Sequence, residues 1–209
     1  MSSLPKSESY ASIDMDAVKE FNSRNNGTNF EIQIKRGAKA GAGDIVNAKV
    51  LLLYANPGHN PKIDKQTPID IKIPGWPLAA LHPDFANHHP GAHRWLTSRL
   101  RHLTERYGAQ FISQNVASIN IVPWASTQYK PMPNLPSRDI QLNLARQAAD
   151  RGAILVAVRA RTAWAPLLEE YPDQVILTSN PRSSYISPAN LGRENWERII
   201  RQLDLSVEK

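Results

Sequence analysis

The sequence contains no cysteine, and this absence removes several classes of site at once. Disulfide bonds, thiolate zinc sites, cysteine nucleophiles and cysteine-held iron–sulfur clusters are all excluded. No apolar run approaches the roughly 18 residues that a membrane-spanning helix needs. The first 16 residues also lack the apolar segment of a secretory signal. We therefore expect a cytoplasmic protein with no membrane partner.

The remaining composition is that of a folded protein with a basic surface. The 209 residues suffice for one domain of ordinary size, and 41% are apolar and 21% charged. The net charge of +6 favours a polyanionic partner, because Lys and Arg displace counterions from phosphates. Arginines cluster in residues 94–106 and again in 193–201. The alternative interpretation of both clusters is a solvated helix face.

The first 47 residues differ in pattern from the rest, and we expect them to form an N-terminal extension ahead of a domain spanning 48–209. Their pattern predicts, in order, a loose tail (1–12), a short helix (15–24), a strand or extended arm (28–35) and a flexible connector (37–43).

Apolar strands that alternate with helices characterise the domain that follows. Strands are predicted at 50–55, 116–124, 153–158 and 174–179. Helices are predicted at 93–107, 162–169 and 192–204, and also at 138–151, where Ser137 is the expected cap and Gly152 the expected stop. Residues 56–92, with seven Pro and three Gly, are predicted to be irregular. This alternation predicts an α/β fold with three α/β/α layers around a central four-stranded parallel sheet.

Ligands of such sheets bind where the strands end at their carboxyl edge. The residues just after each predicted strand are therefore the informative ones. They are Asn56-Pro57-Gly58, Asn120 with the nearby Pro123-Trp124, Arg159-Ala160-Arg161, and the run from Asn180 to Ser184. None of these segments is a phosphate-binding loop, because no strand leads into G-x-G-x-x-G or a Lys-Ser/Thr motif.

Three of these strand ends carry a resemblance. "YANPG", "INIVPW" and "TSNPRSS" together resemble the uracil-DNA glycosylase superfamily, most closely its mismatch-specific and single-strand-selective branches, over about residues 48–204. In that superfamily the first motif ends a strand with x-N-P-G, an Asn on a middle strand reads the flipped base, and a His-Pro-Ser or Asn-Pro-Ser loop enters the duplex. The chain departs from this pattern at Tyr54, where Gly is usual, at Asn180, where many members have His, and at Arg182, where Ser is usual.

The resemblance implies a uracil-DNA glycosylase-like fold and a set of catalytic and base-binding residues. Asn56 would orient the attacking water by its amide oxygen, and Asn180 would be the second catalytic residue. Gly58 would leave space beside C5 of the base, and Asn120 would read the edge of a pyrimidine. Trp76, with Phe85 as second choice, is the candidate for stacking on the base. The alternatives are a plain turn for "NPG", a core Asn bonded to loop backbone for Asn120, and simple packing for the aromatic rings.

The last motif is the expected DNA-binding loop. The residues assigned to DNA contact are Arg182, Ser183 and Ser184, with Tyr185 or Ile186 as a wedge in the vacated stack, and His59 on a phosphate. A surface turn is the alternative for this loop. The histidines of "HPDFANHHPGAH" include no His-x3-His pair within a predicted helix and no obvious carboxylate partner, so solvated histidines or phosphate contacts are expected and a metal is not.

Together these features predict a monomeric, cofactor-free DNA glycosylase without strand-cleaving activity, acting on double- or single-stranded DNA. The open space at Gly58 favours a C5-modified pyrimidine, up to the bulky bases of viral DNA, and hence a defence role. The alternatives are repair of uracil or 5-hydroxymethyluracil, a non-catalytic nucleic-acid binder that keeps the fold, and an enzyme acting on free nucleosides.

Overall fold

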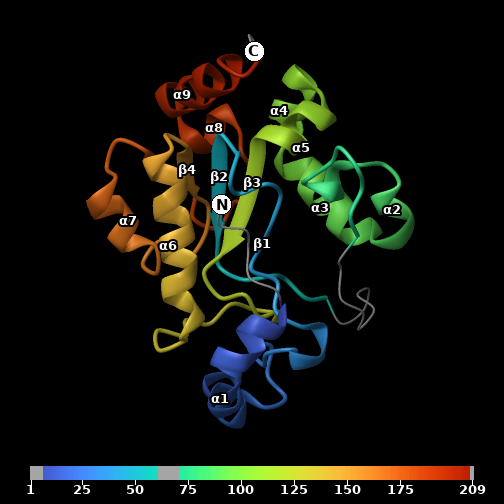
Figure 1. Ribbon diagram of the computed structural model, residues 1–209, viewed down its shortest axis with the longest axis vertical. Coiled ribbons are helices and arrows are strands. Elements are labelled where there is room, and N and C mark those ends of the chain that lie inside the picture. The colour runs from blue at the N-terminus through green and yellow to red at the C-terminus, as the bar shows by residue number, and fades with distance from the viewer. Residues whose placement is uncertain (1–6, 61–70, 208–209) are drawn as a thin grey trace.

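The computed structural model describes residues 7–60 and 71–207. A mixed five-stranded sheet forms its centre, in the order β1-β3-β2-β4-β5 (Figure 1). The strands are β1 (Gly41–Ala42), β2 (Val50–Tyr54), β3 (Val116–Asn120), β4 (Ile154–Ala157) and β5 (Val175–Leu177). β2 pairs in parallel with β3 and β4, and β4 pairs in parallel with β5. The α/β class is therefore confirmed, whereas the sheet has one strand more than expected.

The additional strand, β1, pairs antiparallel with β3 and lies within the predicted connector. Glycine permits this pairing, because a Cβ on Gly41 would lie 2.2 Å from the carbonyl oxygen of Ser118. Residues 41–42 of "GAKAGAG" therefore form a paired strand, and the prediction of a flexible connector was wrong at these positions.

Helices cover both faces of the sheet, because alternate side chains of β2 are buried in two different hydrophobic clusters. Val50, Leu52 and Tyr54 belong to one buried cluster, and Leu51 and Leu53 belong to the other. The first cluster includes residues of α3 (Pro90–Arg99), α4 (Arg101–Tyr107), α5 (Ala109–Asn115), α8 (Pro188–Leu191) and α9 (Arg193–Asp204). The second includes residues of α1 (Ser7–Asn25), α6 (Ser137–Asp150) and α7 (Ala165–Glu170). This two-sided burial explains why the strands are continuously apolar.

The predicted helix 93–107 is two helices. Leu96, Leu100 and Leu103 are buried, as the spacing predicts, but the backbone at Leu100 leaves helical geometry with φ −100° and ψ 9°. The predicted irregular segment 56–92 contains a 3₁₀ helix, η2 (Ala79–Leu81), and the short α2 (Phe85–His88). Residues 61–70 of that segment lie outside the described part of the chain.

All four predicted strands are shorter than expected, and β3 differs most. The apolar residues Ile121, Val122 and Trp124 are buried, yet they follow the end of β3. In its backbone pairing, Trp124 forms an isolated β-bridge with Ala38 and is not part of a strand. The apolar run predicted a longer strand because these residues are buried, but they do not take part in the hydrogen-bonded ladder of the sheet.

Helix α1 is longer than predicted, since residues 7–12 of the expected tail are helical and residues 1–6 lie outside the described residues. Asp14 of α1 is fully buried and accepts hydrogen bonds from Ser137 N at 2.9 Å and Trp124 Nε1 at 2.8 Å. The start of α6 is thus capped by Asp14, and the predicted cap by the Ser137 side chain was wrong.

The chain between α1 and β2 follows the edge of β3 and its continuation. The 3₁₀ helix η1 (Ile34–Arg36) lies within it, where a strand or extended arm was expected. Backbone hydrogen bonds link Gln33 N to Ala125 O at 2.8 Å and Lys39 N to Pro123 O at 2.7 Å. The N-terminal segment therefore borders the loop that follows β3. No helix of the described residues is long and apolar enough to cross a membrane.

Candidate functional site at the carboxyl edge of the sheet

The ends of β2, β3, β4 and β5 meet at one edge of the sheet because these strands run in the same direction. β2 and β3 run toward this edge at the bottom of Figure 1. The Asn56 loop follows β2, an arginine-bearing loop follows β4, and the Asn180 loop follows β5. Asn120 ends β3, and Pro123-Trp124 follow it. The four segments that the sequence singled out therefore belong to one edge.

The side-chain amide of Asn56 has a fixed orientation. Its Nδ2 donates to Ser126 Oγ at 2.8 Å and to Trp124 O at 3.4 Å. The Ser126 hydroxyl donates to Gln128 O at 2.8 Å, so its oxygen is left to accept from Asn56. Asn56 Oδ1 accepts no hydrogen bond from the residues that the structure describes. Sequence reasoning missed Ser126, which carries no motif of its own.

The loop after Asn56 pairs with the segment around Ser126. Gly58 forms a parallel bridge with Ser126, and His59 N donates to Ser126 O at 3.1 Å. Gly58 is exposed, its φ lies outside the left-handed region, and a Cβ there would meet nothing within 4 Å. The loop is held by backbone pairing and leaves open space at Gly58.

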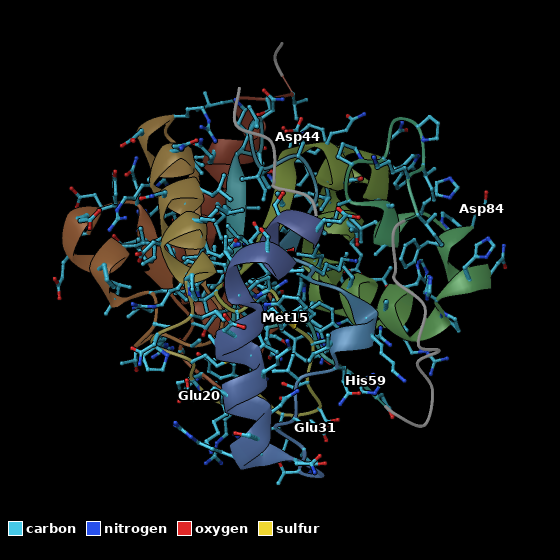
Figure 2. The ribbon with its side chains drawn as sticks, turned by 60° about the horizontal axis from the view of Figure 1, so that its bottom comes forward. Met15, Glu20, Glu31, Asp44, His59 and Asp84 are labelled. Atoms are coloured by element: carbon cyan, nitrogen blue, oxygen red, sulfur yellow. The ribbon has the colours of Figure 1, made fainter. Side chains whose placement is uncertain are left out.

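His59 lies where this loop meets the N-terminal segment. It lines a pocket of about 280 Å³ together with Asn22, Glu31 and residues 32–36. Figure 2 shows Glu31 and His59 on the same side of the molecule, beside α1. The structure therefore surrounds His59 with residues of the extension.

Asn120 is the last residue of β3 and stands opposite Tyr54 of β2 in the register. Its Nδ2 donates to Lys39 O at 3.0 Å, and its backbone N donates to Ala40 O at 2.7 Å. The amide is bonded to the neighbouring loop backbone, which is the contact of the alternative interpretation. A role in reading a base stays a prediction, and Oδ1 and the second proton of Nδ2 are the groups left for it.

Trp76 lies away from the Asn56 loop. Its ring packs edge-on against His82, with centroids 4.7 Å apart. The preceding residue, Gly75, contacts the end of α5, because its carbonyl oxygen accepts a hydrogen bond from Gln114 Nε2 at 3.4 Å. Because α5 leads directly into the first residue of β3, this places Trp76 toward the amino edge of the sheet. Phe85, the second stacking candidate, is buried.

The loop after β5 is organised by a buried residue, Asn190 of α8. Asn190 Oδ1 accepts from Asn180 N at 3.1 Å, and its Nδ2 donates to Tyr185 O at 2.8 Å. Asn180 Oδ1 accepts from Arg182 N at 2.9 Å, which closes a local turn. The Nδ2 of Asn180 has no hydrogen-bond partner among the described residues, and the Asn180 side chain is exposed.

The predicted DNA-binding residues of this loop differ in exposure. Arg182 and Tyr185 are exposed, and Ser183 is half-buried. Ser184 is buried, and its hydroxyl accepts from Arg99 Nε at 3.1 Å. Ile186 is fully buried in the core, so of the two proposed wedge residues only Tyr185 lies at the surface.

Arginines that the motifs did not mark gather around the same loop. Arg159 Nη2 donates to Arg182 O at 2.5 Å, and Arg161 Nη2 donates to Thr178 Oγ1 at 3.3 Å. Ala160 between them adopts a left-handed φ of 54°, a conformation that L residues seldom take. Arg99 of α3 reaches the loop through Ser184.

These arginines have no carboxylate partner among the described residues. Ion pairs are made by arginines elsewhere, among them Arg24, Arg101, Arg106, Arg146 and Arg193. The sequence explains the contrast, because Asp and Glu are absent from residues 45–63, 85–104, 106–138, 151–168 and 174–193. These stretches include the ends of all four parallel strands, so the carboxyl edge is positively charged.

Tyr54 lies beneath this charged surface. Its side chain is 6% exposed, and its hydroxyl is buried with no hydrogen-bond partner in the described part of the chain. Burial raises the pKa of Tyr54, and the charges of Arg99 and Arg159 act in the opposite direction. The phenol is therefore neutral at physiological pH.

No three His, Asp or Glu side chains gather as a metal site would need anywhere in residues 7–60 and 71–207. No protein-family model matches the chain, and no curated protein matches it. The assignment of a function therefore rests on the motifs and on the geometry of the carboxyl edge.

Proposed function

We propose that the protein is a monofunctional DNA glycosylase with a uracil-DNA glycosylase-like fold. It flips a pyrimidine nucleotide out of DNA and hydrolyses its N-glycosidic bond at the carboxyl edge of the sheet, leaving an abasic site. The fixed amide of Asn56 is the observation that carries this proposal.

Asn56 suits the task of positioning water. Its two amide protons are directed at Ser126 Oγ and Trp124 O, so its orientation is set before a substrate arrives. The oxygen keeps its accepting capacity and holds a water by one of that water's protons. Prior orientation matters because a reacting atom misplaced by about 1 Å can cost roughly a hundredfold in rate.

The charge of the edge supports a nucleic-acid substrate. Arg99, Arg159, Arg161 and Arg182 have no carboxylate partner among the described residues, and the strand-end segments contain no Asp or Glu. Arginines that are not neutralised by the protein attract the phosphates of DNA and release its counterions.

The reaction needs little from the protein besides position and charge. The C1′–N bond breaks with its electron pair leaving on the base, and the sugar becomes an oxocarbenium-like cation. The water held by Asn56 Oδ1 adds to C1′ and releases its proton to solvent. Asn180 Nδ2 donates a hydrogen bond to the anionic base, which then takes up a proton from solvent. No cofactor and no covalent intermediate are required.

The open space at Gly58 extends the proposal to the substrate. A Cβ at this position would meet nothing within 4 Å, so the loop places no side chain against a substituent of the base. We therefore assign pyrimidines that carry a C5 substituent as the preferred substrates.

The test is incubation of the protein with a panel of duplex and single-stranded DNAs that carry uracil or C5-modified pyrimidines. Released bases are identified by mass spectrometry, and abasic sites are revealed by alkaline cleavage. Asn56→Ala is expected to lose base release by about a hundredfold or more while binding the same DNA with unchanged affinity. Full activity in Asn56→Ala contradicts the proposal.

A non-catalytic DNA-binding protein is the second candidate, and one observation favours it. Asn120, the expected reader of the base, already donates to Lys39 O. Tight DNA binding without release of any base from the panel would support this candidate over the glycosylase.

A further inference from the structure

Among the Phe, Trp and Tyr side chains of the described residues, Trp95 and Tyr185 are the two exposed ones, with 41% and 45% of their surface accessible. They come from distant parts of the sequence, α3 and the loop after β5. One side chain joins them, because the guanidinium carbon of Arg99 lies 5.2 Å from the Trp95 ring centroid and 4.7 Å from that of Tyr185. The two rings thus form one surface with a cation between them.

This surface is held in place from below and from the side. The Trp95 ring packs on buried Tyr54, with centroids 5.4 Å apart and planes inclined by 58°. Arg99 donates from Nε to Ser184 Oγ at 3.1 Å and from Nη1 to Ser98 Oγ at 2.8 Å. The side chains are therefore ordered before any ligand binds, which lowers the entropic cost of binding.

The charge around the rings is unbalanced. Arg182 lies three residues before Tyr185, and its carbonyl oxygen accepts from Arg159. Neither arginine has a carboxylate partner among the described residues. No Asp or Glu occurs in residues 85–104 or 174–193, the two segments that carry the rings. Exposed aromatic faces beside unneutralised arginines are the combination that binds single-stranded nucleic acid, because bases stack on the rings and phosphates meet the charges.

We propose that Trp95, Arg99 and Tyr185 form a stacking shelf for unpaired bases of a DNA strand next to the nucleotide that Asn56 acts on. This inference rests on the proposed function for the identity of the neighbouring nucleotide. Bases inside a duplex have both faces covered by their neighbours, so the shelf binds only bases that are unpaired or extruded. The protein accordingly prefers single-stranded or locally opened DNA to intact duplex.

Two oligonucleotides of equal length separate stacking from phosphate contacts. One is oligothymidylate, and the other is a chain of tetrahydrofuran abasic units with the same number of phosphates. Binding of the full-length protein to each is measured by fluorescence anisotropy. We expect wild-type protein to bind oligothymidylate more tightly, and Trp95→Ala and Tyr185→Ala each to lose roughly tenfold on it. Affinity for the abasic chain is expected to change less than about twofold.

The ring-preserving variants Trp95→Phe and Tyr185→Phe are the matched controls and are expected to retain most of the base-dependent affinity. Thermal melting checks that each variant is folded. If the alanine variants lose affinity for both chains equally, or for neither, the shelf is wrong, even if the wild-type protein releases a base from DNA. If they lose affinity for oligothymidylate alone while no DNA of the panel yields a free base, the shelf holds and the glycosylase assignment fails.

Discussion

Asn56 Nδ2 lies 2.8 Å from Ser126 Oγ, although the two residues are 70 positions apart in the chain. Ser126 is 2% exposed, and its hydroxyl proton is directed at Gln128 O. Two consecutive hydrogen bonds, from Asn56 to Ser126 and from Ser126 to Gln128, thus join the loops that follow β2 and β3. They determine the orientation of the Asn56 amide. A buried serine therefore orients the side chain that we propose holds the attacking water.

Ser126→Ala tests this positioning role. The substitution removes the acceptor of Asn56 Nδ2 and leaves Trp124 O at 3.4 Å as the remaining contact. Because one such hydrogen bond contributes about 1 kcal/mol, we expect kcat for base release to fall roughly fivefold to tenfold with KM little changed. Initial rates at several concentrations of the best substrate of the panel, under multiple turnover, give both values.

Ser126→Thr keeps a hydroxyl and is the control, with kcat expected closer to wild type. A purely structural role would lower the melting temperature of Ser126→Ala without lowering kcat in the folded protein, and that outcome contradicts the positioning role.

Arg182→Ala tests the contact with phosphate. The Arg182 side chain is exposed and has no partner among the described residues, so its charge is available to DNA. The variant is expected to bind all DNA sequences more weakly, and the slope of log K against log salt should become less steep by about 1. Titrations at several salt concentrations measure the slope.

Arg201→Ala removes a charge of the same kind from α9, at the opposite end of the molecule in Figure 1. Its salt slope is expected to equal that of the wild type. Equal slopes for Arg182→Ala and Arg201→Ala would exclude Arg182 from the DNA interface.

The sequence predicts the elements of this fold better than their junctions. The apolar runs of β2 and β4 and the spacing of Leu96, Leu100 and Leu103 mark buried faces because periodicity reports burial directly. The break at Leu100 and the strand β1 escape prediction because both depend on what the backbone meets in space. Gly41 looks flexible in the sequence, whereas the fold needs it for close approach to Ser118.

The candidate site shows the same division. The motif residues Asn56 and Asn180 could be found from strand ends, since polar residues at a carboxyl edge are informative. Ser126 and Arg99 could not, because a serine in a loop and an arginine on an amphipathic helix match countless solvated positions. Only the pairing of distant segments gives them a partner, and no local pattern encodes that pairing.

Asp14→Ala tests the attachment of the N-terminal segment. The substitution leaves Ser137 N and Trp124 Nε1 buried without their acceptor. Leaving buried donors unsatisfied costs about 1–3 kcal/mol each, so we expect the two to cost roughly 2–6 kcal/mol and the melting temperature to fall by at least about 5 °C. Thermal unfolding followed by circular dichroism measures the shift.

Asp16→Ala removes an exposed carboxylate two residues away on the same helix and is expected to shift the melting temperature by less than about 2 °C. A comparably small shift for Asp14→Ala would show that the buried hydrogen bonds of Asp14 do not hold α1 to the start of α6.

Gly58→Tyr tests the substrate preference. A Cβ at Gly58 would meet no other atom within 4 Å, and φ at this residue lies outside the left-handed region. The variant should therefore fold without backbone strain, and melting within about 2 °C of wild type is expected for an exposed substitution. The new ring fills the space beside C5 of the base while Asn56 and Ser126 keep their hydrogen bond. We expect activity on C5-substituted pyrimidines to fall by about a hundredfold, and activity on uracil, where present, to fall far less.

Gly58→Ala, which adds one methyl group in the same place, should lose much less on either base. Parallel base-release assays on matched oligonucleotides decide the point, because equal loss on both bases, or no loss on either, means that Gly58 does not face C5 and removes the argument for a C5-modified substrate.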